Sequence, residues 1–79
     1  MKILEFVVKR GAELKRENPK LRHGQAAMSA LFEIDSAEYT RITGTDLDPF
    51  YLDSKLPEFY LDLAEINGEY ETEYKIEVT

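Results

Sequence analysis

Residues 44–53 read Gly44-Thr45-Asp46-Leu47-Asp48-Pro49-Phe50-Tyr51-Leu52-Asp53, which places a helix stop, a polar loop and a helix start in close succession. Gly44 follows a short apolar pattern and suits the left-handed residue that ends a helix. Asp48 before Pro49 predicts an N-cap and the first position of a new helix. Apolar side chains follow directly, so we expect the loop to rest on the core.

Two predicted helices lie immediately before this loop. Helical spacing predicts a helix over about residues 21–33, and its apolar positions are Gly24, Ala27, Met28, Leu31 and Ile34. Its many small residues favour close approach of a neighbouring helix, so we expect it to be central. Asp35 with Glu38 three places on matches a capping box and predicts a short third helix that Gly44 ends.

Two further helices are predicted at either side of this pair. After the loop, a helical stripe comprises Leu56, Phe59, Tyr60, Leu63 and Ile66. At the start of the chain, residues 2–17 predict a helix that ends at Asn18-Pro19. A strand over residues 3–8 is the alternative, because β-branched and aromatic residues are frequent there and Gly11 costs about 1 kcal/mol inside a helix.

The C-terminal residues follow a different period. From Tyr70 to Val78, residues with apolar or β-branched side chains alternate with charged ones, which predicts a strand. Such a strand needs the first segment, a second copy or a foreign sheet edge as its neighbour, and disorder is the alternative. We therefore predict a mainly α fold, with a small bundle of about four helices over residues 1–68 and an acidic C-terminal strand or tail over residues 69–79. The fold becomes α+β if that strand is paired.

Composition restricts the classes of function. The 79 residues include 10 basic and 16 acidic side chains, giving a net charge of −6, which argues against direct nucleic-acid binding. Basic residues gather in the first third of the chain and glutamates near its end, a distribution that suits a protein partner or self-contact. A chain this short buries only about 60% of its unfolded surface, so we expect a homodimer.

Several other sites and locations are not expected. The chain has no cysteine and a single histidine, His23, and it contains no phosphate-binding glycine loop or nucleophile motif. We therefore expect a protein that is not an enzyme and that needs no cofactor. The first residues combine short apolar patches with charges, which predicts neither a signal peptide nor a membrane span, so we expect a cytoplasmic protein without membrane contact.

The loop carries the chemistry that the sequence offers. We predict that Arg22 and Gln25 hold residues 44–48 of this loop in place, since a guanidinium and an amide suit a segment rich in aspartates and free carbonyls. The residues of this structural loop lock are Arg22, Gln25, Gly44, Thr45, Asp46 and Asp48. The alternative is a metal site formed by Asp46, Asp48 and Asp53, which would make the protein a small metal-dependent hydrolase, although the spacing differs from that of an EF-hand.

The acidic C-terminal segment is the predicted partner-binding site. Aromatic residues often anchor interfaces, and here they alternate with carboxylates. The predicted partner-binding residues are Glu69, Tyr70, Glu71, Glu73, Tyr74 and Glu77. An alternative is that these carboxylates imitate the phosphates of DNA and block a DNA-binding protein.

Two motifs resemble those of a group of small uncharacterised proteins encoded by bacteria and their phages. The motifs are Arg22-His23-Gly24-Gln25-Ala26, matching Arg-x-Gly-Gln-Ala at a helix start, and residues 44–50, matching a Gly-Thr-Asp-x-Asp-Pro-Phe loop. The resemblance covers about residues 18–63 and implies a mostly helical fold and a bacterial or phage source. By analogy with small acidic phage proteins, we expect a non-enzymatic inhibitor or modulator of a host protein, such as a component of anti-phage defence.

Overall fold

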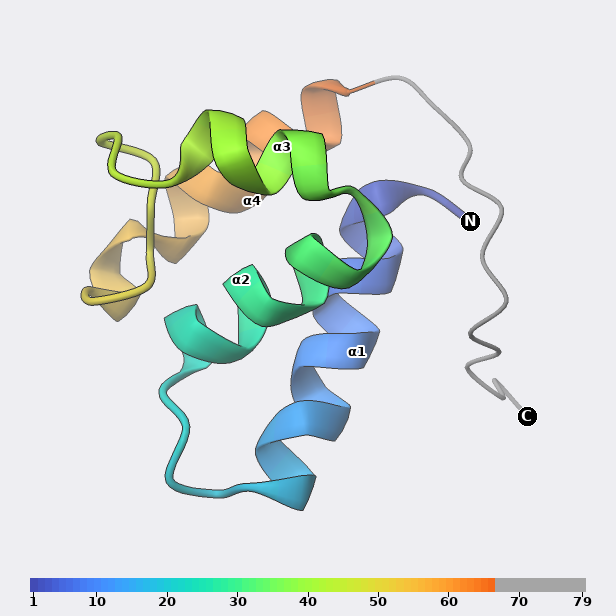
Figure 1. Ribbon diagram of the computed structural model, residues 1–79, viewed down its shortest axis with the longest axis vertical. Helices are drawn as coiled ribbons and strands as arrows, with labels where there is room; N and C mark the ends of the chain where they lie inside the picture. The colour runs from blue at the N-terminus through green and yellow to red at the C-terminus, as the bar shows by residue number, and fades with distance from the viewer. Residues whose placement is uncertain (67–79) are drawn as a thin grey trace.

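The computed structural model describes residues 1–66 and is mainly helical over this range (Figure 1). The elements are α1 (Ile3–Glu17), α2 (His23–Ile34), α3 (Ser36–Ile42), the short 3₁₀-helix η1 (Asp53–Lys55) and α4 (Leu56–Glu65). The four predicted helices are thus confirmed. The predicted strand over residues 69–79 lies outside the described residues.

Helix α1 resolves the alternative left open for residues 3–8, because these residues are helical and not a strand. Ile3, Phe6 and Val7 lie on its buried face, at the spacing of an amphipathic helix. The helix ends at Glu17, and its C-cap Asn18 precedes Pro19, which disfavours helical geometry in the residue before it.

Helix α2 is central, as its small residues predict. It packs against α1, α3 and η1 (Figure 1). Along α1, Gly11 faces the backbone of Ala26 and Ala27, and an added Cβ at Gly11 would lie 3.7 Å from both residues. Such a distance is an ordinary van der Waals contact. The two backbones can lie this close because the residues at the contact are small.

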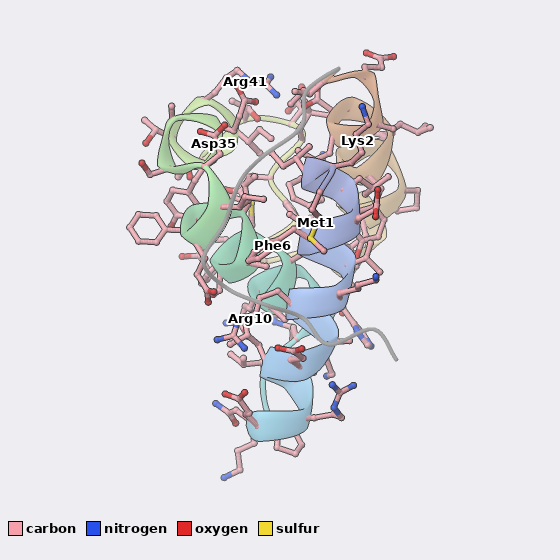
Figure 2. All side chains as sticks on the ribbon, turned by 90° about the vertical axis from the view of Figure 1, so that its right-hand side faces the viewer. Met1, Lys2, Phe6, Arg10, Asp35 and Arg41 are labelled. Carbon is pink, nitrogen blue, oxygen red and sulfur yellow. The ribbon has the colours of Figure 1, made fainter. Side chains whose placement is uncertain are left out.

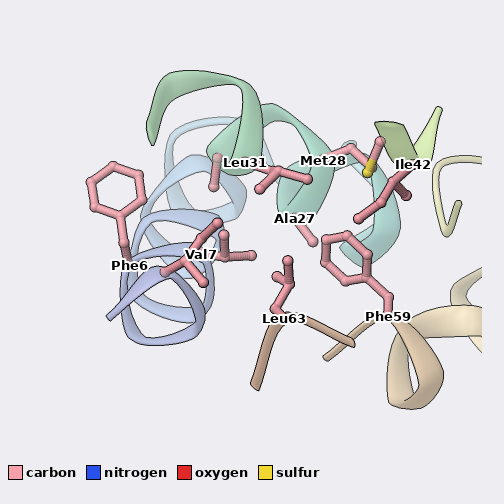
Figure 3. Packing of buried hydrophobic residues seen from close by; sticks show 10 residues of the cluster. Phe6, Val7, Ala27, Met28, Leu31, Ile42, Phe59 and Leu63 are labelled. Atoms are coloured by element: carbon pink, nitrogen blue, oxygen red, sulfur yellow. The ribbon is translucent and has the colours of Figure 1, made fainter. Parts of the chain in front are cut away.

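The core is formed by one set of apolar side chains from all four α-helices (Figure 3). Phe6 comes from α1, Leu31 from α2, Ile42 from α3, and Phe59 from α4, and each is at most 1% exposed. Because every α-helix contributes to this cluster, separation of any one of them would expose apolar surface to water.

Two arginines connect neighbouring helices at the surface, Arg10 on α1 and Arg41 on α3 (Figure 2). Arg10 Nε donates to Glu33 of α2 at 2.9 Å. This hydrogen bond is the main reason why the pKa of Arg10 is raised. Arg41 donates to Asp62 of α4 and to Glu38 within its own helix at 2.7 Å. Surface ion pairs contribute at most about 1 kcal/mol each, so these two pairs add to the contacts that the shared core already makes.

The loop between α3 and α4 differs from its prediction in one respect. Gly44 has φ +80° and ends α3, as expected. Asp48 is not an N-cap, because its carboxylate accepts from the N–H groups of Gly44 at 2.8 Å and Phe50 at 2.9 Å. These bonds hold a turn within the loop. The next helix begins only at Leu56, after η1, with Pro57 in its first turn.

Pro49 is buried in this loop because its backbone lies directly on the first turn of α2. A Cβ added to Gly24 would lie 1.8 Å from the Pro49 carbonyl oxygen and 2.7 Å from its carbonyl carbon. No side chain fits at such distances, so the glycine of the Arg-x-Gly-Gln-Ala motif is required by the approach of the Asp48-Pro49 loop.

We predict opposite effects of alanine at the two helical glycines. Gly24→Ala forces the Pro49 backbone away from α2 and should lower the free energy of unfolding by about 3 kcal/mol, the upper end of the usual range for overpacking. Gly11→Ala introduces only contacts at 3.7 Å, and it should raise stability by up to about 1 kcal/mol through helix propensity. Urea unfolding of both variants measures the difference, and equal effects would contradict the proposed steric requirement at Gly24.

Candidate functional site

Asp53 fastens the loop to the start of α2. Its Oδ1 accepts from the Gly24 N–H at 2.9 Å, between residues that are 29 positions apart in the chain. The first N–H groups of a helix have no partner within the helix, and a carboxylate there is also favoured by the helix dipole. Asp53 therefore serves as a cap supplied from outside the helix, and it holds η1 against α2.

Arg22 and Gln25 do not hold the loop in the predicted way. Arg22 Nη1 donates to the Tyr51 carbonyl at 3.4 Å, beyond the 44–48 segment. Gln25 Oε1 accepts from the Arg22 backbone N–H at 2.9 Å and so caps its own helix. The prediction is wrong in its contacts because the glutamine is used locally, while the loop is fastened by Asp53.

The remaining residues of the predicted loop lock hold the loop by bonds within it. Thr45 Oγ1 donates to the Ile42 carbonyl at 2.7 Å and accepts from the Leu47 N–H at 3.2 Å. The Asp48 carboxylate closes the turn to Gly44. Asp46 is exposed on this loop.

The alternative metal site has no support in the described part of the chain. Within residues 1–66, His, Asp and Glu side chains form no group of three or more close enough to hold a metal ion. The two carboxylates instead accept hydrogen bonds from backbone N–H groups. Asp48 accepts from residues of its own loop, and Asp53 accepts from the start of α2.

Anchoring of the loop gathers four aromatic rings on one surface. Phe32 comes from α2, Tyr39 from α3, and Phe50 and Tyr51 from the loop; we call this group the aromatic surface. Phe32 and Tyr39 meet edge to face with ring centres 5.1 Å apart, and Phe50 and Tyr51 do so at 4.9 Å. Phe32 remains 57% exposed and Tyr51 70% exposed. Aromatic rings left this open to water are available for contact with another molecule.

Two shallow hollows divide the aromatic surface. One has a volume of about 330 Å³ and lies among Phe32, Tyr39 and Phe50. The other has a volume of about 120 Å³ and lies among Tyr39, Phe50 and Tyr51, with Met28 also in its wall. Both are open to solvent, and both share Tyr39 and Phe50. Their shape and apolar walls suit the side chains of a protein partner.

The aromatic surface was not predicted from the sequence. Its four residues have no periodic spacing, and they come from three segments that only the anchored loop brings together. One signal was present: Phe32 follows Leu31 of the core stripe and lies beside Glu33, on a side of α2 that faces away from the core. The predicted partner-binding residues 69–77 lie outside the described residues.

Comparison with known protein families, with curated proteins and with solved structures gives no significant match. Within residues 1–66, no helix has the length and apolar character needed to cross a membrane.

We predict that Asp53→Ala lowers the free energy of unfolding by about 1–2 kcal/mol, because the Gly24 N–H loses its acceptor. Asp46→Ala removes the same charge from an exposed site and should change stability by less than about 0.5 kcal/mol. Arg22→Ala should also stay within about 0.5 kcal/mol, since its single bond to Tyr51 is long and exposed. Chemical unfolding of the three variants tests this order, and a larger loss for Arg22→Ala than for Asp53→Ala would contradict it.

The pKa of Tyr60 is raised above its usual value of 10.0. Burial of the hydroxyl is the larger cause, and the negative charge of Asp53 is the smaller one. A raised pKa in the folded state means that the unfolded chain releases this proton first, so stability falls as the pH rises above about 10. We predict that Tyr60→Phe reduces this alkaline loss and leaves the pH dependence below pH 9 unchanged. Melting curves between pH 7 and 11 measure it; equal alkaline slopes for both proteins would refute the prediction.

Proposed function

We propose that this chain is a non-enzymatic protein-binding module and that the aromatic surface is a contact for its partner. The observation that carries the proposal is the exposure of Phe32 and Tyr51 on two edge-to-face aromatic pairs around shared hollows. Aromatic residues are enriched where protein interfaces bury their central contacts. A folded domain gains little stability from rings that stay largely in water.

The same rings are held at fixed positions, which favours binding. Loops usually lose conformational entropy when they enter an interface, and that loss weakens affinity. Here the Phe50 N–H is held by Asp48 and the following segment by Asp53, so the loop is ordered before a partner arrives. The partner thus meets a rigid surface.

We propose that the partner is a protein of a bacterial host. In this proposal the chain is encoded by a phage, forms a homodimer and modulates the host protein in the host cytoplasm. Two features support this: the resemblance of residues 18–63 to small bacterial and phage proteins, and the acidic charge of the chain. The segment with Glu69, Tyr70, Glu71, Glu73, Tyr74 and Glu77 is proposed as a second contact. Inhibition of an anti-phage defence component is the specific form of modulation that we propose.

The experiment is affinity capture from a bacterial lysate with the tagged full chain, read by mass spectrometry. We expect one host protein that is captured by the wild-type chain and at least tenfold less by the double variant Phe32→Ser, Tyr51→Ser. Both side chains are largely exposed, so this variant should keep its fold, which circular dichroism checks.

Leu61→Ser is the matched control, because Leu61 is 66% exposed but lies on α4 outside the aromatic surface. Capture should be unchanged in this variant. Equal loss with Leu61→Ser, or capture that does not depend on the aromatic rings, would reject the aromatic surface as the contact. A captured DNA-binding protein that is released by DNA and by salt would instead favour the DNA-mimic hypothesis.

A further inference from the structure

A second surface feature lies away from the aromatic surface, along α1. It is a hollow of about 420 Å³ bounded by α1, α2 and α4. Its apolar walls are Val8 and Ala12 of α1, Ala26 and Ala27 of α2, and the ring of Tyr60. Val8 is 47% exposed there. We call this hollow the basic groove because basic side chains also line it.

One end of the hollow carries basic side chains. Lys15, Arg16 and His23 all line it, whereas the protein as a whole has a net charge of −6. Lys15 Nζ donates to the Leu21 carbonyl at 2.6 Å, which holds its ammonium group in place at the rim. An apolar floor with cations at its rim favours a ligand that presents both apolar side chains and carboxylates.

A second, separate hollow lies near the place where the described chain ends. It has a volume of about 280 Å³, and its walls include Leu4, Ala64 and Ile66 together with the charged side chains of Lys2 and Glu5. Leu4, Val8 and Ala12 are four residues apart and therefore lie on one face of α1. The two hollows thus follow the same side of α1, and Ile66 stands beside one of them.

We propose that the basic groove binds an acidic extended peptide and that residues 69–79 of the same chain supply it. Their sequence alternates Tyr, Thr, Ile and Val with four glutamates and one lysine, so one side of an extended segment is mostly apolar and the other is acidic. This composition complements the apolar floor and the cationic rim. The proposal concerns a contact within the chain and does not require the foreign partner or the aromatic surface.

Chain length permits this contact. Residues 67–79 can span about 43 Å when extended, and the face of α1 from Leu4 to Arg16 is about 18 Å long. The segment starts next to Ile66 of the second hollow, and Lys15, Arg16 and His23 line the first hollow. A host protein that binds the acidic segment would therefore compete with the groove for it.

The test places a spin label on the acidic segment of the full chain. The protein has no cysteine, so Lys75→Cys gives a single labelling site on the charged side of the alternation. In a ¹⁵N-labelled sample, we expect the amide signals of Val8, Ala12 and Arg16 to broaden by paramagnetic relaxation. Signals of Phe32 and Thr40, which lie away from the groove, should broaden at least threefold less.

A pair of charge variants tests the role of the rim. Arg16→Glu reverses a charge in the groove, and Lys20→Glu makes the same change in net charge at an exposed residue that does not line it. We expect Arg16→Glu to remove most of the broadening at Val8 and Ala12, and Lys20→Glu to retain it. Equal loss in both variants would show that net charge alone attracts the segment and would overturn the proposed site.

Mixing identifies the chain that supplies the segment. A ¹⁵N-labelled chain without a spin label is mixed with a chain that carries the spin label but no ¹⁵N. We expect no broadening at the groove in this sample. Broadening in the mixed sample would assign the groove to the segment of a second copy and overturn the contact within one chain. Absence of broadening at Val8 and Ala12 in the singly labelled chain would overturn the proposal altogether. Since no host protein is present, neither result bears on the proposed contact between the aromatic surface and a host protein.

Discussion

The close contact between Gly24 and the Pro49 carbonyl is the constraint on which the second half of the fold depends. Because an added Cβ would lie 1.8 Å from that oxygen, the loop backbone reaches α2 only where a side chain is missing. Asp53, at the end of the loop, accepts a hydrogen bond from the N–H of Gly24. These two contacts determine where η1 begins and, through it, where α4 enters the core.

The same contact creates the candidate binding surface. With Pro49 fixed on α2, the next two residues place their rings beside Tyr39 of α3 and near Phe32 of α2. The aromatic surface thus results from the anchoring of a loop and not from an apolar face of any one helix. Residues 44–53 thus combine a structural role with the binding role that we propose for the aromatic surface.

The residues at one end of the basic groove and the C-terminal sequence have opposite charges. Arg10 and Arg41 form ion pairs that connect helices, while Lys15 and Arg16 line the basic groove. Residues 69–77 contain four of the 16 acidic side chains of the chain. Under the proposed contact within the chain, a partner that binds the acidic segment would compete with the basic groove for it.

The sequence by itself determined the features that depend on neighbouring residues. Helical spacing of apolar residues predicted all four helices, Asp35 capped α3 as its position indicated, and Gly44 ended that helix with a positive φ. Each of these follows from hydrogen bonds or side-chain periodicity within a few residues. Only the tertiary structure decided that Asp53 caps α2, that Pro49 is buried against Gly24, and that four aromatic rings share one surface. These contacts join residues up to 29 positions apart, and local patterns carry no information on which distant backbone will approach. The chemistry of Arg22 and Gln25 therefore could not show that the loop packs on Gly24.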